Sequence, residues 1–193
     1  DMVESISTDQ AAAILDELPS DQLVDVFNEM EEEATESILT KMDVEGAEEA
    51  RVLLSYPPDC AGGLMIAEYL VFKTDNSIQD VLDNLQVNRD KYHEYNVQYL
   101  YVVDEDNLLS GVLRMHDLLF PPKSTLLSEI MIKNPLSIVD TTKLNELKNF
   151  FDEHNLFGAP VVNDTRKLVG VVLPKTVNDE ISKQKTKAYL RLS

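Results

Sequence analysis

The residues near the start of the chain that are best suited to metal chemistry are two aspartates four positions apart. Asp21 and Asp25 lie in sequence of helical pattern, and residues at i and i+4 share one face of a helix. Two carboxylates on one face can attract a divalent cation, and Mg²⁺ prefers carboxylate oxygens together with retained water. The spacing leaves two interpretations open, a metal-binding face and an ordinary solvated acidic face.

The acidic charge is concentrated in the first third of the chain. The 193 residues include 35 acidic and 17 basic residues, for a formal net charge of −18. Residues 1–62 contain 17 of the acidic residues, with only Lys41 and Arg51 as basic ones. A surface of this sign repels phosphate backbones, which argues against nucleic acid as a partner. It favours either solubility alone or the collection of divalent cations.

The other reactive residue types show no catalytic arrangement. His93 and His154 stand far apart in the sequence and Cys60 is the single cysteine, so no His/Cys cluster indicates a zinc or iron site. No nucleophile elbow, P-loop or Gly-x-Gly-x-x-Gly pattern occurs. We therefore expect no enzymatic activity. A single cysteine also suits a reducing compartment.

The first part of the chain shows helical periodicity without strand signals. Ser20 is a residue type typical of a helix N-cap. Four apolar residues follow it at the spacing of one helix face: Leu23, Val26, Phe27 and Met30. The paired prolines Pro57 and Pro58 end the last helix and begin a linker. This pattern predicts a small superhelical domain of short stacked helices.

The rest of the chain contains one supersecondary unit twice. Residues 101–104 and 109–113 recur as residues 160–163 and 168–172, with one offset of 59 positions. Each copy follows a strand-like and a helix-like segment, so the order strand–helix–strand–strand–helix occurs in both. A cleft between paired units of this kind is the first place to look for a ligand.

With these elements in order, the chain resembles a known family. The two Val-Val turns, each followed by a Gly-Val strand, are similar to a tandem pair of CBS domains. The junction Ala61-Gly62-Gly63-Leu64-Met65 lies between the acidic helices and the repeats, and this order is similar to the cytosolic region of MgtE-type magnesium transporters.

The fold class that we expect is α+β. It comprises an acidic helical domain over residues 1–60, complete or truncated, CBS domains over 61–122 and 123–176, and a connecting helix over 177–193. The chain begins and ends within helix-like sequence, as expected of a piece of a longer protein.

The resemblance implies a regulatory region on the cytoplasmic face of the cell membrane. This segment would be soluble, would form a homodimer through its CBS domains, and would precede a magnesium-conducting transmembrane domain. Mg²⁺ held between acidic faces would favour the compact, closed state, because a ligand shifts an equilibrium toward the state that it binds better. The metal ligands that the resemblance implies are Asp21 and Asp25, with Asp179 of the connecting helix.

The sequence departs from the family pattern around this connecting helix. The family usually carries a Thr-Val-Asp-Asp run where this chain has Leu173-Pro174-Lys175-Thr176, and the following helix contains several lysines, including Lys187. One interpretation is that a lysine ammonium substitutes for a bridging cation. The other is a basic segment that lies close to a membrane.

The alternative function is an adenine-nucleotide sensor in which metal plays little part. In many CBS pairs an aspartate holds the ribose, and Asp117 matches this position. Arg114 and His116 could contact phosphate, Arg114 as a fork of donors, and Tyr99 matches a position near the adenine. ATP or another adenine nucleotide is the ligand expected there. Asp117 could equally be the N-cap of the helix that starts at Leu118.

Overall fold

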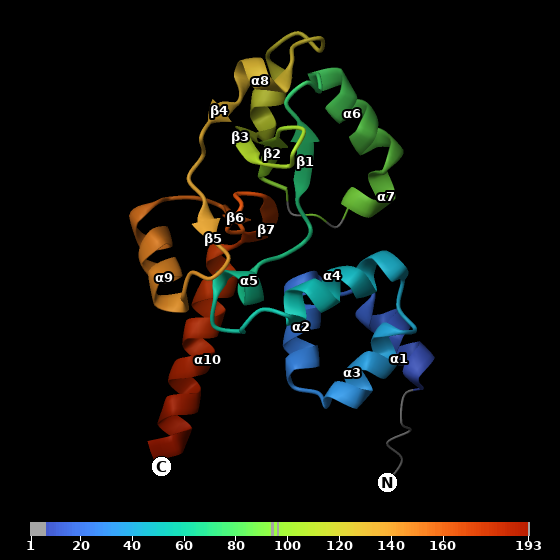
Figure 1. The fold of residues 1–193 in the computed structure, drawn as a ribbon, viewed down its shortest axis with the longest axis vertical. Coiled ribbons are helices and arrows are strands. Elements are labelled where there is room, and N and C mark those ends of the chain that lie inside the picture. The colour runs from blue at the N-terminus through green and yellow to red at the C-terminus, as the bar shows by residue number, and fades with distance from the viewer. Residues whose placement is uncertain (1–6, 94, 96, 193) are drawn as a thin grey trace.

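The computed structural model describes residues 7–93, 95 and 97–192, which fold into a helical domain, two small α/β units and a long C-terminal helix (Figure 1). The helical domain consists of α1 (Thr8–Leu15), α2 (Ser20–Asn28), α3 (Glu32–Leu39) and α4 (Val44–Leu54), and the junction after it contains the short helix α5 (Ala61–Leu64).

The helical domain has a small apolar core of its own, formed by residues at helical spacing: Ala12, Leu15, Leu23, Phe27, Ile38, Leu39, Met42, Ala47 and Ala50. Two sequence predictions were wrong in detail. Ser20 is the first residue of α2, and Pro19 takes the N-cap position. Val26 stays 37% exposed, whereas Val24 is buried because it belongs to the core of the second α/β unit.

The first α/β unit contains a four-stranded sheet in the order β1-β2-β3-β4. Its elements are β1 (Leu70–Lys73), α6 (Ile78–Val87), α7 (Arg89–Tyr92), β2 (Tyr99–Val103), β3 (Leu109–Arg114) and the 3₁₀ helix η1 (Met115–Leu119). The second unit contains a three-stranded sheet in the order β5-β6-β7. Its elements are β5 (Ile138–Val139), α9 (Leu144–Glu153), β6 (Ala159–Val162) and β7 (Leu168–Val172).

The predicted repeat of 59 residues is visible strand by strand. Each unit has a parallel first pair of strands followed by an antiparallel hairpin. The hairpin register shifts at the equivalent place, after Val102 in β2 and after Val161 in β6. The turns are equivalent too, since Asn107 and Arg166 both adopt a positive φ, of 64° and 65°. Equal apolar spacing in the two repeats therefore gives equal strand geometry.

Each sheet is completed by the segment that precedes the other unit. The helix α8 (Leu127–Ile130) and strand β4 (Ile132–Lys133) lead into the second unit, yet β4 pairs with β3 of the first sheet. Likewise Ile66, which leads into the first unit, forms an antiparallel bridge with Val171 of β7. This exchange joins the two units into one framework.

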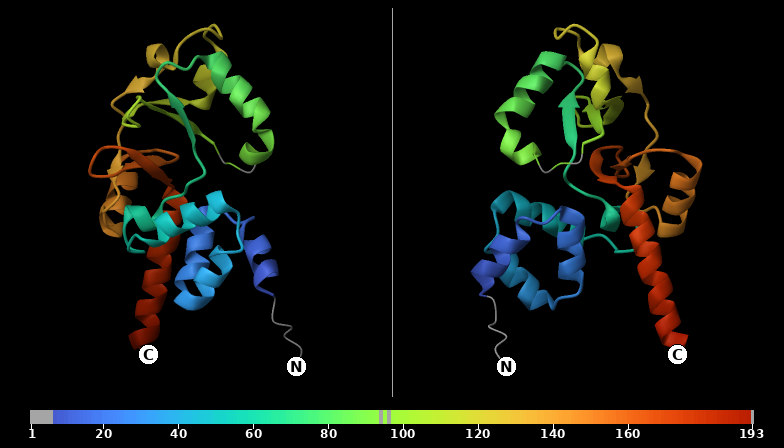
Figure 2. Two further views of the ribbon diagram at one scale, coloured as in Figure 1. Left: turned by 45° about the vertical axis from the view of Figure 1, so that its right-hand side comes forward. Right: turned by 180° about the vertical axis from the view of Figure 1, so that it is seen from behind.

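The C-terminal helix α10 (Pro174–Leu192) begins three residues before Val177, the start expected from the sequence. Proline suits this position because the first helical residue needs no N–H partner. Val177 is buried in the core of the second unit, and α10 then runs past that unit beside the helical domain (Figure 2). Among the residues described, no helix is both long and apolar enough to cross a membrane.

We expect Gly170→Ala to destabilise the second unit. A Cβ atom at Gly170 would lie 2.5 Å from Sδ of Met65 and 3.0 Å from its Cβ, closer than packed atoms approach. Overpacking of this kind costs about 1–3 kcal/mol of unfolding free energy, which denaturant titration measures.

The matched control for this substitution is Gly46→Ala in α4. A Cβ atom there would meet only Asp16 Oδ1, at 3.7 Å, and alanine favours helix over glycine. Its stability should be equal to that of the wild type or higher. If Gly170→Ala unfolds at the same denaturant concentration as the wild type, the close packing of Met65 on β7 is refuted.

Candidate functional site

A cleft of about 1100 Å³ is lined on one side by α2 and the turn before it and on the other by α10, with further residues from the junction and from α7. Its lining includes eight acidic residues, Asp16, Glu17, Asp21, Asp25, Glu68, Asp90, Asp179 and Glu180, and four basic ones, Lys91, Lys175, Lys183 and Lys187. The three residues predicted to bind metal all line this cleft. The structure therefore brings them to one place from two distant parts of the sequence.

The helix α2 directs both of its predicted aspartates toward α10. The hydroxyl of Thr176 donates a hydrogen bond to Oδ2 of Asp21 at 3.2 Å. The ammonium of Lys183 forms an ion pair with the carboxylate of Asp25. Asp179 lies between Thr176 and Lys183 along α10. One predicted ligand, Asp25, is thus already neutralised by a side chain of the protein.

The donor set fits a hydrated magnesium ion better than an enclosed one. Within residues 7–93, 95 and 97–192, no group of three or more histidine, cysteine or carboxylate side chains is arranged to hold a metal ion. Mg²⁺ usually keeps several waters and takes only one or two carboxylates from a protein. Asp21 and Asp179 could serve in this way across the cleft.

Lys183, rather than Lys175 or Lys187, contacts a carboxylate of the helical domain. The hydrogen bond to Asp25 is the main cause that raises the pKa of Lys183, and the nearby charges of Glu180 and Glu29 add to it. The ammonium is therefore charged at any physiological pH. The sequence suggested that a lysine could take the place of a bridging cation. In the structure Lys183 is in a position to do so, since it pairs with Asp25 across the cleft.

A buried hydrogen-bond network fixes the start of α2 to the junction. Ser20, which is only 5% exposed, donates from its backbone N–H and its hydroxyl to the two carboxylate oxygens of Glu68, at 2.8 and 2.7 Å. The N–H of Ala67 in turn donates to the Ser20 hydroxyl at 2.9 Å. Glu68 thus supplies the acceptor and the negative charge that favour a helix N-terminus, from 48 residues away.

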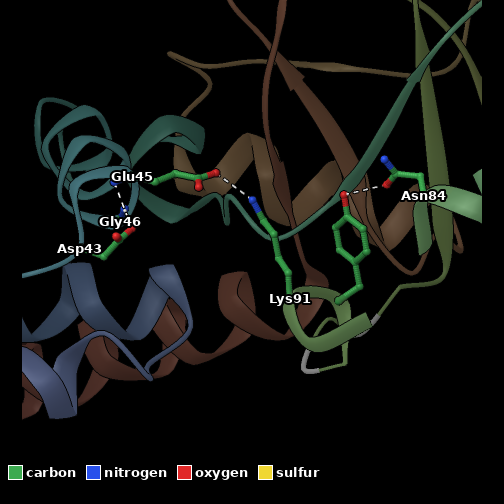
Figure 3. A network of polar contacts seen from close by, with 6 residues as sticks. Asp43, Glu45, Gly46, Asn84 and Lys91 are labelled. Carbon is green, nitrogen blue, oxygen red and sulfur yellow. Dashed lines mark hydrogen bonds and ion pairs between the residues drawn. The ribbon is translucent and has the colours of Figure 1, made fainter. Parts of the chain in front are cut away.

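A second lysine joins the helical domain to the first α/β unit. Figure 3 shows Lys91 of α7 reaching Glu45 of α4, with Nζ 2.8 Å from Oε1. Glu49, one turn further along α4, lies close enough to both Lys91 and Glu45 for their charges to shift its pKa. Partial burial is the main cause that raises the pKa of Glu49, the carboxylates of Glu45 and Glu68 raise it further, and Lys91 lowers it.

The residues predicted to bind a nucleotide lie together at the end of the first hairpin. Tyr99 of β2 is directly opposite Arg114 of β3. The Arg114 guanidinium holds Asp117 through two hydrogen bonds of 3.0 Å, which is the main cause that lowers the pKa of that carboxyl, and His116 Nε2 lies 3.1 Å from it. Asp117 is not at the N-cap position, which Arg114 occupies. As the third residue of η1, Asp117 still caps this helix by accepting from the backbone N–H of Arg114.

The space between the two α/β units is nearly filled by side chains. The cavity there has a volume of about 30 Å³, on the scale of one water molecule. Tyr99 and Phe157 face each other across it, with ring centroids 6.2 Å apart, and the N–H of Phe157 donates to the Tyr99 hydroxyl at 3.4 Å. A base could enter only if these two rings moved apart.

Comparison with known proteins assigns both parts of the chain to described families. Residues 1–59 match the MgtE intracellular N domain, and residues 61–120 and 127–183 match the CBS domain. The chain belongs to the CBS-domain family and carries an MgtE intracellular N domain ahead of its CBS pair.

The curated relatives of this chain include magnesium transporters. Magnesium transporter MgtE of Thermus thermophilus is 31% identical over 144 residues, which cover 75% of this chain and 32% of that protein. Magnesium transporter MgtE of Enterococcus faecalis is 24% identical over 149 residues, which cover 77% of this chain and 32% of that protein. The chain thus spans about a third of the length of these relatives.

Solved structures share the fold. The soluble part of a magnesium transporter superposes with a TM-score of 0.82 at 23% identity, covering 92% of this chain and 69% of that chain. The cytosolic domain of the Mg²⁺ channel MgtE in complex with ATP gives a TM-score of 0.67 at 24% identity, covering 90% and 80%. The family and the α+β fold class predicted from the sequence are confirmed.

We expect Glu49→Gln to raise the melting temperature near neutral pH by about 1–2 °C. Because the pKa of Glu49 is higher in the folded state than its ordinary value of 4.5, the carboxyl stabilises the fold most below pH 4.5. That contribution is lost as the pH rises through the folded-state pKa, and glutamine avoids the loss. Thermal melts across this pH range measure the effect.

The control is Glu48→Gln, the adjacent residue on α4. It removes the same charge and should leave the pH dependence of the melting temperature unchanged. A lower melting temperature for Glu49→Gln at neutral pH would contradict the assigned origin of the pKa shift.

Proposed function

We propose that this chain is the regulatory, non-catalytic cytosolic region of a magnesium transporter, lying on the cytoplasmic face of the membrane. In this proposal Mg²⁺ favours the docked position of the helical domain against α10. The observation that carries it is the cleft, in which eight acidic residues outnumber four lysines. The excess negative charge opposes docking until cations screen it.

The position of α10 supports a role in gating. Its first turns are anchored in the second CBS unit through Val177, and its free length lies beside the acidic helical domain. In relatives of which the matched region makes up about a third, a transmembrane domain would follow it. Docking of the helical domain would then fix α10, and release would free it to move.

A homodimer through the CBS units is part of the same proposal. Strongly exposed apolar side chains lie on these units, namely Leu119, Phe120, Ile132 and Phe157. Apolar surface of this kind is stabilised when a second surface covers it.

Small-angle scattering against Mg²⁺ concentration tests the magnesium proposal. The radius of gyration of the wild-type chain should fall as Mg²⁺ is added. Asp21→Asn combined with Asp179→Asn should shift the midpoint to Mg²⁺ concentrations at least about tenfold higher, because both cleft carboxylates that a hydrated ion can use are removed.

The control removes two charges from a different surface of the same domain. Glu32→Gln combined with Glu33→Gln changes α3, outside the cleft, and should leave the midpoint where it is in the wild type. A radius that is insensitive to Mg²⁺ in all three proteins would refute magnesium sensing.

A second candidate function is the binding of an adenine nucleotide at the first hairpin. It is favoured by the grouping of Tyr99, Arg114, His116 and Asp117, and a fold relative was crystallised with ATP. The ligand would have to part Tyr99 from Phe157 and share Asp117 with Arg114.

Calorimetric titration with ATP tests this candidate. Asp117→Ala should weaken ATP binding about tenfold, the effect expected when a charged hydrogen-bond acceptor is lost. Asp106→Ala, in the exposed turn between β2 and β3, is the control with the same charge change. Equal affinity for ATP in both variants, or no heat of binding with the wild type, would refute ATP binding at the first hairpin.

A further inference from the structure

Two of the lysines that line the cleft pair with carboxylates of the acidic helical domain. Lys183 of α10 pairs with Asp25 of α2. Lys91 of α7 pairs with Glu45 of α4 (Figure 3). The two lysines come from different units of the molecule, and both carboxylates belong to the helical domain.

These contacts differ from ordinary surface ion pairs in the charge around them. Lys183 acts among Asp25, Glu180 and Glu29, and Lys91 lies near Glu45 and Glu49. Each ammonium therefore offsets more than one carboxylate. The helical domain supplies most of this negative charge, since residues 1–62 contain 17 acidic and two basic residues.

We propose that Lys91 and Lys183 are built-in counter-cations that help to hold the helical domain in its docked position and so lower the Mg²⁺ concentration at which docking occurs. The proposal rests on the proposed function and adds the element that sets its threshold. A tethered ammonium is present at a fixed effective concentration, whereas Mg²⁺ acts according to its free concentration. The more attraction the lysines supply, the less must come from the metal.

Other contacts hold the helical domain against the second CBS unit and the junction without neutralising its acidic charge. Val24 and Leu53 are buried in the core shared with the second CBS unit, and Ser20 is bonded to Glu68. These contacts stabilise the docked position without supplying positive charge. Removal of the two lysines should therefore shift the Mg²⁺ response without abolishing the docked state.

The test compares Mg²⁺ titrations of the whole 193-residue chain, followed by small-angle scattering. Lys183→Gln and Lys91→Gln should each raise the midpoint about two- to fivefold, the range set by partly exposed ion pairs. The two shifts should multiply in the double variant, because the lysines pair with different carboxylates on different helices. Raising the ionic strength should reduce the difference in Mg²⁺ midpoint between the double variant and the wild type, because salt screens the two ion pairs.

The controls are Lys185→Gln on α10 and Lys133→Gln on β4, both exposed lysines outside the cleft lining. They remove the same charge and should leave the midpoint unchanged. Thermal melts in excess Mg²⁺ confirm that each variant folds.

The outcomes separate this inference from the proposed function. Midpoints that rise for Lys91→Gln and Lys183→Gln but not for the controls support it. A wild-type response to Mg²⁺ with the same midpoint in every variant refutes the counter-cation role and leaves magnesium sensing intact. Equal shifts for all four lysines would show an effect of net charge only, and would also refute it. If neither the wild type nor any variant responds to Mg²⁺, the proposed function fails and the inference falls with it.

Discussion

The electrostatic contact between the acidic helical domain and the framework beside it is the constraint on which the rest of the structure depends. A domain with so much negative charge can dock only where cations meet it or where other contacts outweigh the repulsion. The structure uses both, with Lys91 and Lys183 as cations and the buried Ser20–Glu68 network among the other contacts. Part of the remaining acidic charge lines the cleft, where a mobile cation can act.

The CBS pair supplies the rigid reference for that contact. Because each sheet is completed by the segment that precedes the other unit, β4 and Ile66 tie the units together. Met65 next to Ile66 is almost fully buried, and three residues later Glu68 reaches Ser20. The junction that ends in the second sheet therefore also positions α2. In the proposed function, a change in docking would act directly on this framework.

Much of the fold could be predicted from the sequence because it depends on local spacing. The repeat of 59 residues predicts matching hairpins, and the helix periodicity predicts α2 with Asp21 and Asp25 on one side. The face of α2 that is buried depends on its neighbours, which explains why Val24 replaced Val26 in the core. Helical periodicity predicts which residues share a face of the helix, but not which neighbouring element covers that face.

The site was only partly predictable for the same reason. Lys91, Glu45 and Glu68 carry no spacing signal, and their roles arise from contacts across 46 to 48 residues. The basic character of the last helix was visible, but only the structure selects Lys183 as the residue that faces Asp25. A lysine at this position makes part of the attraction independent of bound metal, because its ammonium is always present. The ion pair is weakened by rising ionic strength. In the proposed function, fixed and exchangeable cations would share this interface, so the acidic cleft would remain available to Mg²⁺ while single surface lysines would set the threshold.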